Sequence, residues 1–212
     1  MKIPLPTEYS YKDIADVENG ILHIHRIQSF TRLMYDLTYA LIDVKECYYC
    51  SKPLTQEQST LDHKYPVDLG GPTIPNNLCT SCRNCNSLKS NLTAEEFKYY
   101  LFLPKEERST FLKKAKNNRH LIKKLYSPIL PDTWISYENI EKIFSYRSLD
   151  NTVVGKSYKK VERNYKKYGH LYRPIIVDKN FKLLDGFNTL VFAKKHSIVE
   201  VPTIILENVE LD

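Results

Sequence analysis

The sequence predicts an α+β protein with a cysteine-rich module in its first half and a second small α+β unit at its end. Three observations predict this. Apolar residues recur at helical spacing from Phe30 to Leu41, five cysteines crowd a loop-rich stretch between residues 47 and 91, and short β-branched runs flank a helical pattern after residue 170. We therefore divide the chain into residues 1–46, 47–103, 104–131 and 132–212.

Residues 1–46 are predicted to be a helical segment. Phe30, Leu33, Met34, Leu37, Ala40 and Leu41 recur on one face, which we expect to pack on the residues that follow. Upstream of this helix, His23 and His25 alternate along a short extended run. We expect structural roles for both.

Composition limits the class of protein. With 42% hydrophobic and 26% charged residues and a net charge of +6, the chain resembles an ordinary globular protein with a mild basic excess, which points toward nucleic acid. No apolar run approaches the ~18 to 20 residues of a membrane span, and no apolar targeting segment opens the chain. We expect a cytoplasmic protein with no membrane partner, in a reducing environment where cysteines bind metal rather than form disulfides.

Two identically spaced cysteine pairs predict a zinc site. Cys47-x2-Cys50 and Cys82-x2-Cys85 each place two thiolates on one side of a tight turn, and together they supply four tetrahedral ligands. Cys79 offers a third cysteine at the same period, but its position after Leu78 suits an apolar core residue. Because four thiolates leave zinc no open position for water, the ion is expected to be structural.

A further set of residues lies between and after the two pairs. It consists of Asp62-His63, Pro66, Gly70-Gly71, Asn77-Leu78 and the run Cys82-Arg83-Asn84-Cys85-Asn86-Ser87-Leu88-Lys89. This pattern resembles the zinc-knuckle form of the HNH endonuclease family, whose ββα-metal motif it matches over about residues 47–91. The resemblance implies a ββα-metal module with a structural zinc.

The resemblance also implies roles for individual residues. His63 would be the general base, because a neutral imidazole takes a proton from water near pH 7. Asp62 and Asn86 would hold Mg²⁺ or Mn²⁺ through oxygen atoms, although the family's final His is replaced here by Asn86. Asn77 would hold the loop between them by side-chain to backbone hydrogen bonds. Since neighbouring strand residues point to opposite faces, Asp62 and His63 need a bulge or a strand end to serve one site.

The expected substrate is double-stranded DNA. Lys89, Arg83 and Lys64 are candidates for contacts with its phosphates. Family chemistry implies hydrolysis of one strand per site, with 5′-phosphate and 3′-hydroxyl products. Cleavage of both strands would need two copies or two visits.

Two helices and a boundary are expected next. Thr93 and Glu96 form a capping box that starts a helix. The Lys- and Arg-rich run from Pro104 to residue 124 is interpreted as a solvated helix face in preference to a DNA-binding surface. Pro128 and Pro131 indicate a boundary.

The last unit begins with a Lys-rich helix that ends at Gly169, for which a solvated face and a phosphate-backbone contact are equal alternatives. The Asp185-Gly186 turn, Ala193 and Val201-Pro202 resemble the ParB/sulfiredoxin-like superfamily, which implies a phosphate- or nucleotide-binding corner at Asp185, Gly186, Asn188 and Thr189. Phe187 and its neighbours replace the usual His or Arg. Sulfiredoxin-type thiol chemistry is excluded, because the sequence has no cysteine after Cys85. We therefore favour docking of DNA or a protein partner over nucleotide turnover.

Two other functions stay open. One is a zinc-stabilised DNA- or protein-binding module that does not cut. The other is a nucleotide-dependent switch in the C-terminal unit.

Overall fold

The fold is taken from a computed structural model that describes residues 1–27, 29–125, 130–149 and 155–212. In chain order, the first elements are β1 (Ser10–Tyr11), β2 (Ala15–Glu18), β3 (Ile21–Ile24), α1 (Phe30–Leu41), β4 (Ser59–His63), β5 (Leu78–Cys82), α2 (Arg83–Lys89), α3 (Ala94–Phe102) and α4 (Lys105–Leu125). They are followed by β6 (Ser136–Asn139), α5 (Lys156–Tyr168), β7 (Ile175–Asp178), β8 (Leu183–Asp185), α6 (Phe187–Lys195), β9 (Glu200–Leu206) and β10 (Val209–Leu211). Pro128, half of the predicted boundary, lies outside the described residues.

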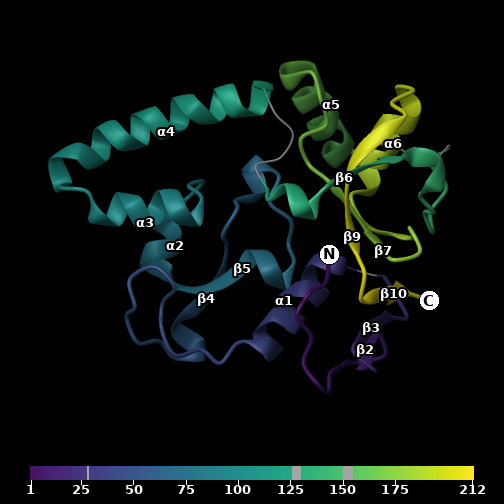
Figure 1. Ribbon diagram of the computed structural model, residues 1–212, viewed down its shortest axis with the longest axis horizontal. Coiled ribbons are helices and arrows are strands. Elements are labelled where there is room, and N and C mark those ends of the chain that lie inside the picture. Colours follow the sequence, from purple (N-terminus) through teal and green to yellow (C-terminus); the bar gives the residue numbers. More distant parts are fainter. Residues whose placement is uncertain (28, 126–129, 150–154) are drawn as a thin grey trace.

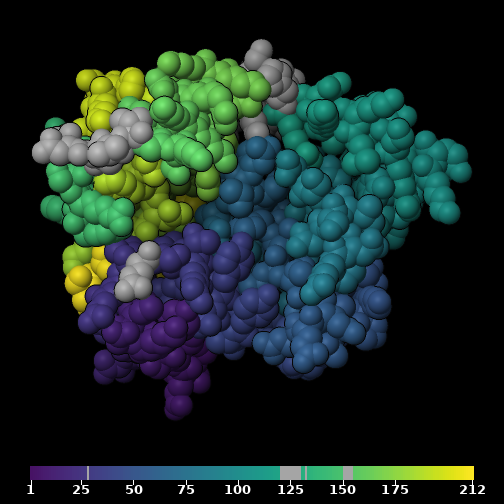
Figure 2. All heavy atoms as spheres, turned by 180° about the vertical axis from the view of Figure 1, so that it is seen from behind, coloured from purple at the N-terminus to yellow at the C-terminus, as the bar shows by residue number. Residues whose placement is uncertain are grey.

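The two ends of the chain share one sheet, with strand order β1-β2-β3-β10. β10 runs parallel to β3, with Leu22 opposite Val209, and the two ends of the chain lie together in Figures 1 and 2. The first 46 residues thus hold three strands before the expected helix. Asn19 and Gly20 both have positive φ, as a tight hairpin turn requires, and this Asn-Gly pair is a hairpin signal that helical periodicity does not register.

His25 lies at the end of this sheet between two carboxylates. Its Nε2 is 2.7 Å from Asp16 Oδ2, and its Nδ1 is hydrogen-bonded to Asp212. The hydrogen bond to Asp16, followed by that to Asp212, raises the pKa of His25 above its usual value. A structural role for His25 agrees with this arrangement.

Helix α1 packs on both halves of the molecule. Its buried face carries Phe30, Leu33, Met34 and Leu37, which share a hydrophobic core with Ile74 of the cysteine-rich module and with residues of β7, β8 and β9. Burial of such side chains stabilises the fold by about 1.5–3 kcal/mol each. The two units are therefore joined through a common core.

The C-terminal unit is a four-stranded sheet of order β6-β9-β7-β8 covered by α5 and α6 (Figure 1). β7 is parallel to β9. β6 pairs antiparallel with β9, and β8 pairs antiparallel with β7. Phe192 of α6 joins the helices, with ring centroids 5.7 Å from Tyr158 and 5.1 Å from Tyr165. Helix α5 ends at Gly169, whose φ of 83° is left-handed, as expected for a glycine at a helix end.

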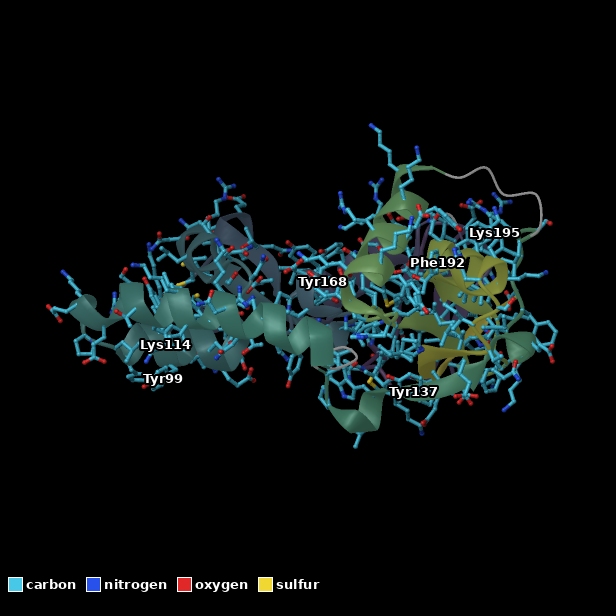
Figure 3. All side chains as sticks on the ribbon, turned by 90° about the horizontal axis from the view of Figure 1, so that it is seen from above. Tyr99, Lys114, Tyr137, Tyr168, Phe192 and Lys195 are labelled. Atoms are coloured by element: carbon cyan, nitrogen blue, oxygen red, sulfur yellow. The ribbon has the colours of Figure 1, made fainter. Side chains whose placement is uncertain are left out.

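Helices α3 and α4 form an arm whose far end lies away from α5 and α6, and α4 runs back from there to contact α5 (Figure 3). The expected capping box is present. Thr93 Oγ1 accepts from the Glu96 amide at 3.2 Å, and Glu96 Oε2 accepts from the Thr93 amide at 2.8 Å. Lys114 lies exposed on α4. Within the described ranges, no helix has the length and apolar character needed to cross a bilayer.

Candidate metal centre and nuclease site

The site is built on a β-hairpin followed by a helix. β4 and β5 pair antiparallel without a shift of register, so that Asp62 lies opposite Cys79 and His63 opposite Leu78. α2 follows β5 directly and packs on both strands. His63 is the last residue of β4, which is the strand end that the predicted site requires.

Four thiols converge at one end of this ββα unit. Their sulfur atoms all lie within 4.8 Å of one another, and they come from the two predicted pairs: Cys47, Cys50, Cys82 and Cys85. Burial alone would raise the pKa of Cys47, but hydrogen bonds from backbone amides, Cys82 first, lower it to about 7. Burial raises the pKa values of Cys50 and Cys85, so the support for zinc is the geometry: four sulfur donors close together are the set that structural zinc prefers.

Cys79 stands apart from the cluster. Its thiol is buried and points toward Tyr49 Oη at 3.6 Å and the Asp62 carbonyl at 3.7 Å. Burial raises the pKa of Cys79 to about 11, so it stays a neutral thiol. The four sulfur atoms that lie together are those of the predicted ligands, and Cys79 is not among them.

The loop between β4 and β5 is held by Asn77, whose side chain is fully buried. Its Oδ1 accepts from the Tyr65 amide at 2.8 Å, and its Nδ2 donates to the carbonyls of Tyr65 at 3.0 Å and Pro72 at 2.8 Å. These are the side-chain to backbone bonds expected of this residue. Gly71 permits the same turn, because a Cβ there would lie 1.8 Å from the Tyr65 carbonyl oxygen.

Asp62 is buried and fully engaged. Its Oδ2 accepts from Tyr49 Oη at 2.6 Å and lies 3.0 Å from Lys89 Nζ, while Oδ1 lies 3.3 Å from the same ammonium. Lys89, with a side chain 0% exposed, also donates to the His63 carbonyl at 2.8 Å. Burial first, together with the hydrogen bond to Asp62 and the charge of that carboxylate, raises the pKa of Tyr49 far above its usual range, so its hydroxyl remains a donor.

This arrangement does not offer a divalent cation two free oxygen ligands. Both Asp62 oxygens have partners from the protein, whereas Asn86 donates its Nδ2 to Thr60 Oγ1 at 3.1 Å and has no described bond to its amide oxygen. A hard cation such as Mg²⁺ keeps several waters and needs open oxygen donors. Asp62 as found does not fit that role, and the predicted ligand pair stays a prediction.

His63 faces a different set of neighbours. Its Nε2 lies 2.9 Å from Thr73 Oγ1, and the edge of its ring meets Tyr35 of α1 at 6.1 Å between centroids. Burial lowers the pKa of His63 to about 4; the charges of Lys89 and Arg173 add to this, and that of Asp62 opposes it. The imidazole is therefore neutral at pH 7. No hydrogen bond among the described residues joins Asp62, His63 and Asn86 to one another.

The three predicted phosphate contacts differ in accessibility. Arg83 is exposed at the start of α2. Lys64 is partly buried and donates to the Asn76 carbonyl at 3.1 Å. The expected contact of Lys89 with DNA phosphate is corrected. Its ammonium is buried against Asp62 and therefore cannot reach a phosphate at the surface.

The C-terminal unit holds a cavity of about 330 Å³ between α5 and the start of α6. Its lining includes the four predicted residues, Asp185, Gly186, Asn188 and Thr189. Lys160 and Arg173 also line it and add two cations where the expected His or Arg after the turn is missing. Gly186 has a φ of 96°, and a Cβ at this position would clash with Ile175. The glycine therefore lets β7 lie close to the turn.

Two residues of the site, Tyr49 and Arg173, are not predicted from the sequence. Tyr49 occupies one of the two positions between Cys47 and Cys50, and its aromatic hydroxyl inside a metal-binding turn is the one signal of its role in the sequence. Arg173 carries no local signal, because its electrostatic effect on His63 depends on the packing of residues distant in sequence.

The four-thiol cluster on a ββα unit is consistent with a structural zinc site. In agreement with this, residues 47–101 match the family model described as HNH endonuclease. The resemblance of this segment to that family is confirmed, and the segment carries an HNH endonuclease domain.

Among solved structures, one match is a Pnob8-like ParB-N domain, with 25% identity and a TM-score of 0.28. It covers 34% of this chain, and the chain spans 28% of that structure's length. An overlap of this size carries no conclusion about function. No curated protein matches the chain.

Proposed function

We propose that the protein is a nuclease that hydrolyses DNA phosphodiester bonds, nicking one strand at each site and leaving 5′-phosphate and 3′-hydroxyl ends. The observation that carries this is His63. It is a neutral imidazole at a strand end within a segment that matches the HNH endonuclease family.

His63 would take the proton from the attacking water. Burial lowers its pKa to about 4, so the ring is neutral and able to accept a proton at pH 7, but it is a weaker base than a free histidine. Thr73, 2.9 Å from Nε2, would orient the ring. Family resemblance predicts dependence on Mg²⁺ or Mn²⁺, although both Asp62 oxygens are occupied by Tyr49 and Lys89.

The test is relaxation of supercoiled plasmid by the zinc-loaded chain with Mg²⁺ or Mn²⁺. His63→Ala should lower the nicking rate by at least 100-fold, the scale of general base catalysis. Lys114→Ala, an exposed change on α4, is the matched control and should nick normally. Equal nicking by wild type and His63→Ala would remove His63 from the mechanism.

A second candidate is a zinc-stabilised DNA-binding module that does not cut. The observation that favours it is the engagement of both Asp62 oxygens by Tyr49 and Lys89. This function predicts duplex binding that weakens steeply with salt and survives His63→Ala, with no product in any divalent metal.

A third candidate is nucleotide binding in the C-terminal cavity. Its volume lies at the lower end of the range for small-molecule sites, and Lys160 and Arg173 supply charge for phosphate. Calorimetry with CTP and ATP tests it, with Arg173→Gln compared to the exposed control Lys12→Gln. Absence of heat with both nucleotides would end this proposal.

A further inference from the structure

We propose that Tyr49 is a positioning residue that links the four-cysteine centre to Asp62, so that metal bound by the thiols fixes the carboxylate beside the catalytic histidine. This inference rests on the nuclease proposal for its functional meaning. Its structural part, the link itself, stands on contacts that do not depend on that proposal.

The first step is the origin of Tyr49. It lies between two ligands, Cys47 and Cys50, so its backbone belongs to the turn that the metal closes. The turn is also fixed from outside, because the Cys47 amide donates to the Lys52 carbonyl at 2.9 Å and the Tyr48 amide to the Thr80 carbonyl at 3.0 Å. Thiol coordination and these bonds together leave the Tyr49 backbone little freedom.

The second step is the direction of the side chain. Tyr49 is 8% exposed, and its ring meets Phe97 edge-on at 5.1 Å between centroids. From this position its hydroxyl reaches Asp62 Oδ2 at 2.6 Å. A hydrogen bond to a charged acceptor is among the stronger contacts in proteins, and its short distance fits that class.

The third step carries the link to the histidine. The Asp62 carboxylate holds the Lys89 ammonium, which in turn donates to the His63 carbonyl at 2.8 Å. Tyr49, Asp62, Lys89 and the end of β4 thus form one buried chain of contacts. Displacement of the Tyr49 hydroxyl would loosen the strand end from which the His63 ring projects.

The neighbouring tyrosine provides a matched control. Tyr48 belongs to the same turn but is 40% exposed, and its ring lies 3.8 Å from Lys98 Nζ. Tyr48→Phe and Tyr49→Phe remove the same atom one residue apart. Only the second removes the contact with Asp62.

The first experiment is a double-mutant cycle in the zinc-loaded full chain, which measures unfolding by urea. Tyr49→Phe and Asp62→Asn should be coupled by about tenfold to 100-fold in the unfolding equilibrium constant, the scale of a hydrogen bond to a charged group. The cycle of Tyr48→Phe with Asp62→Asn should be additive within about twofold. Additivity in both cycles would overturn the link.

The second experiment follows the strand end directly. Cobalt substitution first shows that both phenylalanine variants keep the thiolate centre. Amide exchange at Lys64, whose N–H donates to the Asn77 carbonyl at 2.8 Å, should then be at least tenfold faster in Tyr49→Phe than in Tyr48→Phe. Removal of zinc from the wild type should produce the same increase. Equal exchange in the two variants would refute the proposal.

Plasmid nicking separates this inference from the nuclease proposal. If the wild type nicks DNA, Tyr49→Phe should slow it at least tenfold and Tyr48→Phe should leave it unchanged; equal rates would overturn the positioning role. Coupling in the cycle without nicking by the wild type would support the link and overturn the nuclease proposal alone.

Discussion

Replacement of Lys89 by methionine tests the buried ion pair most directly. Methionine keeps most of the aliphatic stem and removes the ammonium. The ammonium is within 3.0 Å of Asp62 Oδ2 and 2.8 Å of the His63 carbonyl, and both side chains of the pair are nearly inaccessible to water. The substitution therefore leaves a buried carboxylate with Tyr49 as its remaining partner.

The expected loss of stability follows from that geometry. Removing one partner of a buried pair costs about 3–5 kcal/mol, because the other charge stays buried without compensation. A protein of this kind has a total stability of only about 5–15 kcal/mol. With an m-value near 3 kcal/mol/M, the urea midpoint should fall by roughly 1 to 1.7 M.

The assay is urea unfolding of zinc-loaded protein followed by circular dichroism. Lys114→Met on the exposed face of α4 is the control and should change stability by less than about 0.5 kcal/mol. The double variant Asp62→Asn with Lys89→Met should recover part of the loss, since no buried charge remains. A midpoint for Lys89→Met equal to that of the control would refute the buried pair.

Three other perturbations have clear expected outcomes. Cys50→Ser should abolish stoichiometric zinc, measured by metal analysis, whereas Cys79→Ser should retain it, because only Cys50 belongs to the four-thiol cluster. The raised pKa of His25 means that its contribution to stability is complete below about pH 6.5 and is lost as pH rises through the folded value. The difference in urea midpoint between wild type and His25→Gln should thus shrink from pH 6 to pH 9. Because the His25–Asp16 pair is exposed, 1 M salt should make this difference smaller at every pH. A difference that stays constant with pH would contradict this expectation. Gly71→Ala should destabilise the protein by about 1–3 kcal/mol or more in the same assay, because its Cβ cannot coexist with the Tyr65 carbonyl.

Local patterns in the sequence predicted much of the fold. The helix at Phe30–Leu41, the capping box at Thr93 and the strand and helix order after residue 170 all depend on residues close together in the chain. The pairing of β3 with β10 was missed, because each strand is three or four residues long and its partner is far away in sequence. Short strands carry too few alternations to be recognised alone.

The same distinction holds for the site. Paired spacing predicted the thiol cluster, and the family resemblance implied that Asn77 would hold the loop. The motif did not predict that Lys89 would turn inward, because a lysine three residues after Asn86 can face either water or the strand at its back. Lys89 turns inward because the buried Asp62 carboxylate accepts its ammonium, and Tyr49 donates a second hydrogen bond to the same carboxylate.

The parallel pairing of β3 with β10 also has a consequence for synthesis on the ribosome. Leu22 is made long before its partner Val209, so the pairing of β3 with β10 cannot form until β10 has left the ribosome. The hairpin and helix that carry His63 need no such distant partner for their own strand pairing and can form while the chain is still growing. A ribosome stalled before β10 should therefore display a nascent chain with a protease-resistant thiol centre and protease-sensitive first strands.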